Sequence, residues 1–315
     1  MGLVDSRPQP LMALVASRES RGVEWRLELE RDAGLLPGQL AKARVRLAAD
    51  RDIEARGLVA SLVGTEHWQY RQTQSNGKTT TTRIVTARDE LRRVPVQVLG
   101  PTNLRAGEVR ELDFEIPTPA LGPASLDATV AGLTWELEVK LDMAGGFDSA
   151  IVVPVRVLQP TALLRAGVVR VGQFALFESA DDATGSTDGV NGTLELDPVP
   201  LCIGAPFTGR MTVETASPLK LQELRVEIRV NARATVSSGL DEEVTLWVGR
   251  LVGEGELPAG SRTIDFEGVL PPRDLPTVEL PHGRTDATVH VILARPWARD
   301  PHVVRDVAIC STTEI

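Results

Sequence analysis

Apolar and polar residues alternate one by one along several segments, and this alternation limits the fold more than any other feature of the chain. The longest example runs from Leu133 to Leu141, where every second residue is apolar and the residues between are Thr, Glu, Glu and Lys. Successive side chains of a β-strand point to opposite faces of its sheet, so this segment is predicted to be a strand with one buried and one solvated face. Similar runs lie at 23–29, 43–47, 112–116 and 224–230.

Turn-forming residues separate these runs. They include Pro37-Gly38, the proline-rich stretch 116–124 and Asn76-Gly77, a pair that favours a type I′ hairpin. No segment has a long helical period, so the crossover helices that a parallel sheet needs are missing. Strands with one apolar face bury it by packing two sheets together. The sequence therefore predicts an all-β fold of antiparallel, immunoglobulin-like β-sandwiches.

The order of turns and strands occurs twice in the 315 residues. The segment 104–107, followed by Phe114-Glu115-Ile116-Pro117, resembles 257–260, followed by Phe266-Glu267 and a proline pair. Chains of this length usually divide their core between domains, and an internal repeat supports such a division. We expect a tail at 1–21 and two tandem sandwich domains at 22–159 and 160–315.

Composition narrows the classes of function. A formal net charge of -9 opposes nonspecific binding to nucleic acid or to anionic lipid. The apolar stretch 11–16 is too short for a membrane span and does not form a secretory signal. Two cysteines are too few for a disulfide framework. These features favour a cytoplasmic protein without a membrane span.

Residues with catalytic potential lack a recognisable pattern. There is no Gly-x-Ser-x-Gly motif, and the histidines have no motif partner: His67, His282, His290 and His302. His290 alternates with Val289 and Val291, which predicts a position on the outer face of a strand. We expect no catalytic residue, no cofactor and no metal.

Two further groups of residues leave an alternative open. The acidic loop with Asp181, Asp182 and Asp188 has oxygen ligands for a hard cation, but it lacks the regular spacing of a calcium loop, so a solvated loop is the favoured interpretation. Cys202 and Cys310 begin and end the second predicted sandwich, where first and last strands can be neighbours. Two buried free thiols are favoured, and a bridge between them is geometrically conceivable.

Several short motifs together resemble arrestins. In the first half they are Pro37-Gly38, Leu62-Val63-Gly64 followed by Trp68, Phe114 to Pro117 after Gly107, Pro123 to Ser125, and the strand from Trp135 to Asp142. The second half resembles the carboxy-terminal arrestin domain. The resemblance implies a scaffold or sorting adaptor, closest in style to the bacterial sporulation-control proteins. Two departures are the mainly acidic strand 23–30, where receptor arrestins carry phosphate-reading cations, and a single tyrosine, Tyr70, outside any Pro-Pro-x-Tyr motif.

The predicted hairpin around Asn76-Gly77 is the best candidate for partner binding. Trp68 and Tyr70 precede it, and amphipathic aromatics of this kind often anchor interfaces. For Trp68 alone, packing against its own sheet is the favoured alternative. Open sheet edges and the groove between domains are other routes to a protein or peptide partner. We therefore expect a non-catalytic adaptor. One alternative is a self-assembling structural protein, which would be a homo-oligomer. The other is an enzyme with His282, His302 and acidic residues at one concave site.

Overall fold

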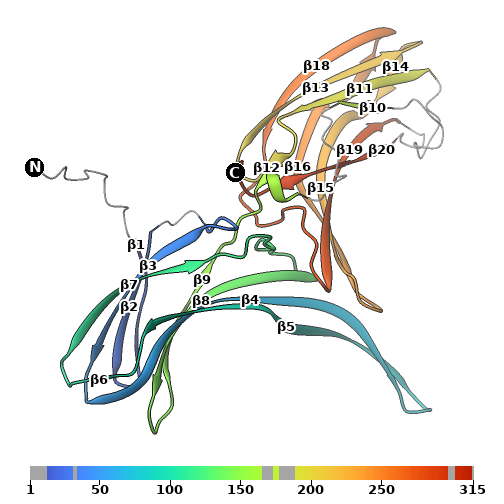
Figure 1. The fold of residues 1–315 in the computed structure, drawn as a ribbon. Coiled ribbons are helices and arrows are strands. Elements are labelled where there is room, and N and C mark those ends of the chain that lie inside the picture. Colours follow the sequence, from blue (N-terminus) through green and yellow to red (C-terminus); the bar gives the residue numbers. More distant parts are fainter. Residues whose placement is uncertain (1–12, 31–33, 165–172, 177–188, 297–301, 314–315) are drawn as a thin grey trace, which may run out of the picture. The chain divides into compact units, whose positions relative to one another are not determined.

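A computed structural model describes residues 13–30, 34–164, 173–176, 189–296 and 302–313. Figure 1 shows that the secondary structure of these residues is almost entirely β, apart from the short 3₁₀ turn η1, Thr161–Leu163. The larger sheets are built from antiparallel pairs of strands. The prediction of an all-β, antiparallel, sandwich-like fold is confirmed. No helix in the described ranges has the length and apolar character needed to cross a bilayer.

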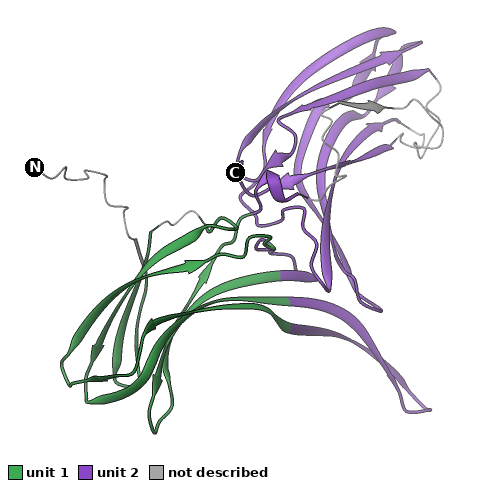
Figure 2. Ribbon diagram, in the orientation of Figure 1, with its two compact units in different colours: residues 1–66, 89–123, 133–158 green, residues 67–88, 124–132, 159–315 purple. Residues whose placement is uncertain are grey.

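The chain divides into two compact units (Figure 2). Unit 1 contains residues 1–66, 89–123 and 133–158, and unit 2 contains 67–88, 124–132 and 159–315. The tandem domains at 22–159 and 160–315 remain a prediction. The division adds that two inserts from the first half of the chain, 67–88 and 124–132, pack with the carboxy-terminal half.

Two sheets form unit 1, and three of their strands continue into unit 2. The first sheet has the order β1-β2-β3-β7, and the second has the order β5-β4-β8-β9 with β6 beside β4. The strands are β1 Ala13–Ser20, β2 Val23–Leu29, β3 Leu40–Ala49, β4 Ile53–Ser75, β5 Thr80–Leu99, β6 Thr102–Leu104, β7 Val109–Pro117, β8 Ala131–Met143 and β9 Ser149–Val155.

The core of unit 1 follows from the alternation in the sequence. Every second residue of β2, and of β8 from Leu133 on, is buried while its neighbours are at least partly exposed. Trp25 of β2 donates a hydrogen bond from its indole N–H to Ser149 Oγ of β9 at 2.9 Å, and Ser149 Oγ donates to the carbonyl oxygen of Ser20 at 2.7 Å. This chain of hydrogen bonds satisfies polar atoms in the interior and connects the two sheets.

Unit 2 also has two larger sheets. Their orders are β10-β11-β13-β18 and β16-β15-β19-β20, and two short pairs, β14-β17 and the parallel β12-β21, lie beside them. The strands are β10 Gln173–Leu176, β11 Val190–Asp197, β12 Leu201–Cys202, β13 Pro206–Thr215, β14 Leu219–Leu221, β15 Glu223–Ala234, β16 Asp241–Val252, β17 Gly255–Leu257, β18 Gly260–Val269, β19 Gly283–Ala294, β20 His302–Val307 and β21 Ile309–Cys310.

An aromatic cluster joins these two sheets. Phe207 of β13 meets Trp247 of β16 edge to face, with ring centroids 5.1 Å apart, and Trp247 stacks on Phe266 of β18 at 5.7 Å. Gly209 and Gly268 leave space for these rings, because an added Cβ would lie 2.1 Å from Phe266 and 2.5 Å from Phe207. The cluster therefore fixes the edge strands β16 and β18 to each other.

A matched pair of leucine substitutions tests the assigned core. Leu137 of β8 is 1% exposed and Leu121, in the loop after β7, is 84% exposed. We expect Leu137→Ala to lower the free energy of unfolding by about 2–5 kcal/mol, because it leaves a cavity, and Leu121→Ala to change it by less than about 0.5 kcal/mol. Urea denaturation followed by tryptophan fluorescence measures both, and similar losses in the two variants would contradict the assignment.

Candidate functional site

The hairpin between β4 and β5, which we call the arm and define as residues 67–88, carries the residues predicted to bind a partner. At its tip the backbone N–H of Asn76 donates to the carbonyl oxygen of Thr79 at 3.2 Å. Gly77 has a φ of 82°, whereas Asn76 is not among the described residues with positive φ. The predicted type I′ turn, which needs positive φ at both Asn76 and Gly77, is therefore wrong.

The Asn76 side chain explains why another turn is stable. Its Oδ1 accepts hydrogen bonds from the backbone N–H of Lys78 at 3.1 Å and of Thr79 at 2.8 Å. Two backbone donors that would otherwise face solvent are thereby paired within the turn. Asn76 and Gly77 thus have a clear structural role at the tip, independent of any partner.

The base of the arm is held by other segments of unit 2. Gln69 donates from its backbone N–H to Val130 at 2.8 Å and accepts at its carbonyl oxygen from Leu240 at 3.1 Å. Arg71 donates from its backbone N–H to Ser238 at 2.9 Å. The loop 128–130 and the turn 238–240 thus fix the start of the arm on both sides.

The two aromatic residues predicted to anchor an interface lie at this base. Trp68 stacks on His282 with ring centroids 4.0 Å apart and an interplanar angle of 17°, and Tyr70 pairs with Gly239 through a β-bridge. Both side chains are half-buried. Trp68 therefore packs within its own unit on one ring face, and the binding role predicted for Trp68 and Tyr70 stays a prediction.

Beyond this base the arm is polar and exposed. Every residue from 71 to 84 is exposed, and the side chains from 71 to 83 are Arg, Lys, Gln, Asn, Ser and Thr, with Gly77 at the turn. Cross-strand contacts hold the ribbon: Arg83 donates to Gln72 Oε1 at 2.7 and 3.0 Å, and Thr73 and Thr82 share a hydrogen bond at 3.1 Å. The arm is thus an ordered polar ribbon without an apolar face near its tip.

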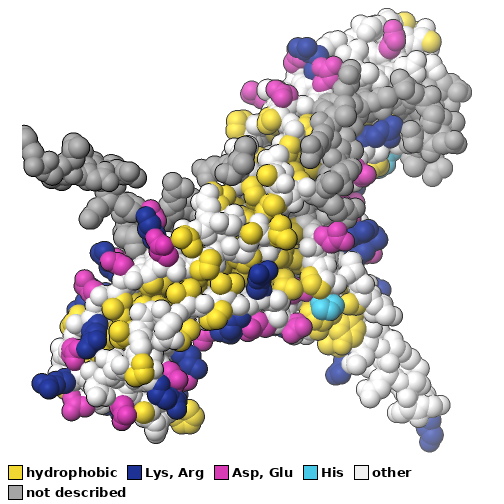
Figure 3. All heavy atoms as spheres, viewed as in Figure 1, with side chains coloured by type: hydrophobic (Ala, Val, Ile, Leu, Met, Phe, Trp, Pro, Cys, Tyr) yellow, Lys and Arg dark blue, Asp and Glu magenta, His cyan; other side chains and the backbone are white. Residues whose placement is uncertain are grey.

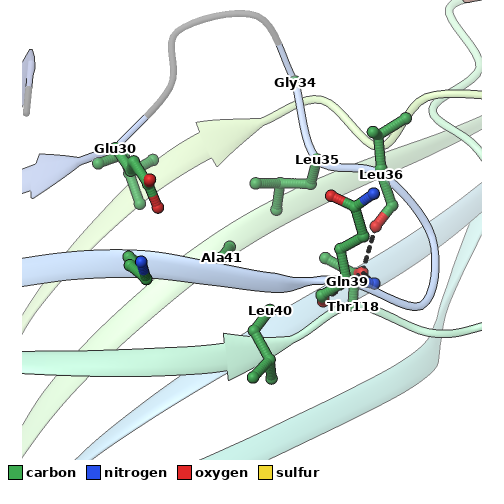
Figure 4. A pocket seen from close by; sticks show the side chains of 10 residues that line it. Glu30, Gly34, Leu35, Leu36, Gln39, Leu40, Ala41 and Thr118 are labelled. Atoms are coloured by element: carbon green, nitrogen blue, oxygen red, sulfur yellow. Dashed lines mark hydrogen bonds between the residues drawn. The ribbon is translucent and has the colours of Figure 1, made fainter. Parts of the chain in front are cut away.

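One cavity, of about 270 Å³, lies in unit 1 (Figure 4), where the Thr118 hydroxyl accepts from the backbone N–H of Gln39 at 3.1 Å and donates to the carbonyl oxygen of Leu36. Its lining residues are Leu29, Glu30, Gly34, Leu35, Leu36, Gln39, Leu40, Ala41, Lys42 and Thr118. This lining contains no His, Cys or Ser, so it offers no nucleophile paired with an imidazole base.

The four histidines do not gather at one concave site. His67 Nε2 lies 3.1 Å from the carbonyl oxygen of Ala128, and His282 stacks on Trp68. His290 Nδ1 and His302 Nε2 lie 2.8 Å apart. His282 precedes β19, so it is about 26 Å along the strand from His290. The enzyme alternative required His282 and His302 to lie together at one concave site. The structure does not bring these two side chains together.

The paired histidines belong to an ionic network on one face of β15 and β19. His290 is opposite Glu227 in the strand register and points away from Val289 and Val291, but it is buried there, so the predicted outer-face position is wrong in its exposure. Burial opposes ionisation of Glu227, but hydrogen bonds from Arg225 at 2.6 Å and Arg229 at 2.7 Å outweigh it, and the pKa of Glu227 is lowered. A buried carboxylate between two guanidinium groups is a structural arrangement that keeps charge paired.

Burial and positive charge keep the histidine pair neutral. His290 is 6% exposed, and this burial, together with the nearby Arg229 guanidinium and His302, lowers the pKa of His290 to about 4. Burial is also the main cause of the lowered pKa of His302. Neither imidazole lines the cavity of unit 1 described above, and the contacts of both, with each other and with the ionic network, are structural.

Cys202 and Cys310 lie opposite each other in the parallel pair β12-β21. Both are buried free thiols, and the Cys310 thiol donates to the carbonyl oxygen of Leu201 at 3.4 Å. Burial, followed by the neighbouring Cys310, raises the pKa of Cys202 to about 12. β10 and β11 precede β12, so Cys202 does not begin the second half as predicted, but β12 does lie beside the last strand, β21, with both thiols free.

No metal site is evident in the described part of the chain, where no three His, Cys, Asp or Glu side chains gather. The acidic loop with Asp181, Asp182 and Asp188 lies outside the described residues. The pairing of His290 with His302 and the stacking of Trp68 on His282 were not predicted. The first depends on the register of β19 and β20, and the second joins positions far apart in sequence, so alternation alone gives no signal for either.

The histidine pair gives a pH prediction. Native His290 stays neutral down to about pH 4, whereas in the unfolded chain it protonates near its ordinary pKa of 6.5. The unfolded state therefore binds more protons between these values, and stability falls as pH falls through this window. We expect His290 to contribute about 2–3 kcal/mol of this loss between pH 7 and pH 4. Urea denaturation of wild type and His290→Gln should give a shallower pH dependence in the variant, and parallel curves would rule the explanation out.

The thiols give a second prediction. In a Cys310→Ala variant Cys202 remains buried, and burial is the main cause of its raised pKa. Because the thiolate is the reactive form, we expect an aromatic disulfide reagent to modify native Cys202 at least about a hundredfold more slowly than the urea-unfolded chain. Equal rates in the two states would contradict the buried position.

Comparisons of the sequence with known proteins leave the chain unassigned, since no protein-family model and no curated protein matches it.

Proposed function

We propose that this chain is a non-catalytic adaptor or scaffold that binds a protein or peptide partner, with the arm as the main contact. The observation that carries the proposal is the exposed polar ribbon at 71–83, fixed at its base within unit 2 by three backbone hydrogen bonds and the stacking of Trp68 on His282. A protruding two-stranded ribbon buries no apolar core of its own, so folding stability alone does not account for its length. A binding role does account for it.

Three further considerations support this proposal. The sandwich-like, all-β fold and the repeated order of turns agree with the arrestin-like resemblance, whose members act as scaffolds and sorting adaptors. Within that family, the plain arrestin-like architecture of the chain is most similar to the bacterial sporulation-control proteins. Composition favours a cytoplasmic location. The fold by itself does not determine function, so the proposal depends on the arm rather than on the resemblance.

Site-specific photo-crosslinking tests the proposal. A photoreactive phenylalanine analogue replaces Thr81 on the arm, and in a matched variant it replaces Thr263, an exposed threonine on β18. We expect proteins of the native lysate to be cross-linked from position 81 and not from position 263, because the partner contacts the arm. Mass spectrometry of the cross-linked products identifies them.

Two results would count against an adaptor. Absence of any cross-linked protein at both positions would contradict binding to the arm. Cross-links exclusively to a second copy of the chain, together with a concentration-dependent mass in light scattering, would favour the self-assembling alternative.

A further inference from the structure

We infer that the arm, residues 67–88, binds an extended acidic segment of its partner, which adds to the arm edge as a β-strand and places carboxylates against the arm cations. This inference rests on the adaptor function proposed above and specifies the chemistry of the partner.

The charge of the arm is opposite to that of the rest of the chain. Its charged residues are Arg71, Lys78, Arg83 and Arg88, with no Asp or Glu between 67 and 88. The other residues have 30 Lys and Arg against 43 Asp and Glu, which gives -13 outside the arm and +4 within it. In Figure 3 the surface at the position of the arm tip in Figure 1 shows blue and white spheres and no magenta. Such separation of charge favours an anionic partner at the arm.

Arginines outside the arm are commonly paired with carboxylates, whereas those of the arm are not. Arg44 pairs with Asp113, Arg210 with Asp265 and Arg233 with Asp241, each at 2.7 Å. Within the described ranges no carboxylate lies within ion-pair distance of an arm cation: Arg71, Lys78, Arg83 and Arg88. The arm therefore offers four cations without breaking an existing ion pair.

The backbone of the arm has an open edge for a peptide. β5 is the outermost strand of its sheet, so residues 80–88 present a row of main-chain N–H and C=O groups on the side away from β4. Such an edge accepts an extended segment as an added strand. From Thr80 to Arg88 this edge of β5 is about 26 Å long, which an extended segment of eight or nine residues spans.

Other anionic partners fit less well. A membrane would need aromatic or aliphatic side chains to enter it, and residues 71–83 contain none. A nucleic-acid duplex or a second copy of this acidic chain would bring a large negative charge close to a body of -13, and the repulsion opposes both. A short acidic peptide carries less charge and contacts the arm alone.

Peptide binding to matched variants tests this inference. The probe is a fluorescein-labelled twelve-residue peptide of alternating Glu and Thr, and fluorescence anisotropy in low salt gives its Kd. The arm variant is Arg71→Gln, Lys78→Gln and Arg83→Gln together; the control variant is Arg105→Gln, Lys220→Gln and Arg262→Gln, three exposed cations outside the arm. Both variants have the same net charge.

We expect the acidic peptide to bind wild type and the control variant, and to bind the arm variant about tenfold more weakly, because the effects of three exposed ion pairs multiply. Added salt should weaken binding to wild type. A peptide of alternating Lys and Thr should not bind measurably. Circular dichroism checks that each variant is folded.

Three outcomes would overturn the inference. The first is that the acidic peptide does not bind wild type, and the second is that its affinity falls equally in the arm and control variants. The third is that a DNA duplex, phosphatidylserine vesicles or a second copy of the chain binds the arm more tightly than the acidic peptide does. If photo-crosslinking from position 81 nevertheless captures other proteins, the adaptor function stands without its acidic partner. If neither experiment detects a partner, both proposals fail.

Discussion

Burial of one face of every strand is the constraint on which the rest of this structure depends. A strand such as β8 is apolar on one face only, and that face is excluded from water when a second sheet covers it. In unit 1 the hydrogen bond from Trp25 to Ser149 connects the two sheets. In unit 2 the two sheets are connected by Trp247, which contacts Phe207 and Phe266. Edges, turns and the arm are what this packing leaves at the surface.

The arm begins where the packing ends. β4 keeps mostly buried or half-buried residues as far as Tyr70, and from Arg71 on every side chain is exposed. No second sheet is needed over a ribbon whose two faces are both polar. Pairing between the two strands and the turn at Asn76 keep it ordered, so charged side chains are held in defined positions at little cost in apolar exposure.

The sequence predicts well those features that depend on local periodicity. Alternation from Leu133 to Leu141 gave the correct strand and the correct buried face, whereas His290, expected on an outer face of β19, is buried in an ionic network that alternation does not predict. It failed at Asn76-Gly77, because the Asn76 side chain pairs with two backbone donors and stabilises a different turn. It did not predict the stacking of Trp68 on His282, since that contact depends on how distant segments pack.

The anchoring of the arm and its capacity to bind are physically linked. A two-stranded ribbon alone is marginally stable in water, so the order of residues 71–83 depends on their base. That base consists of Trp68 on His282 and the backbone hydrogen bonds to Val130 and Ser238. A partner that binds an ordered ribbon avoids the entropic cost of ordering it first. Trp68 can therefore contribute to affinity through its own packing within unit 2, without touching the partner.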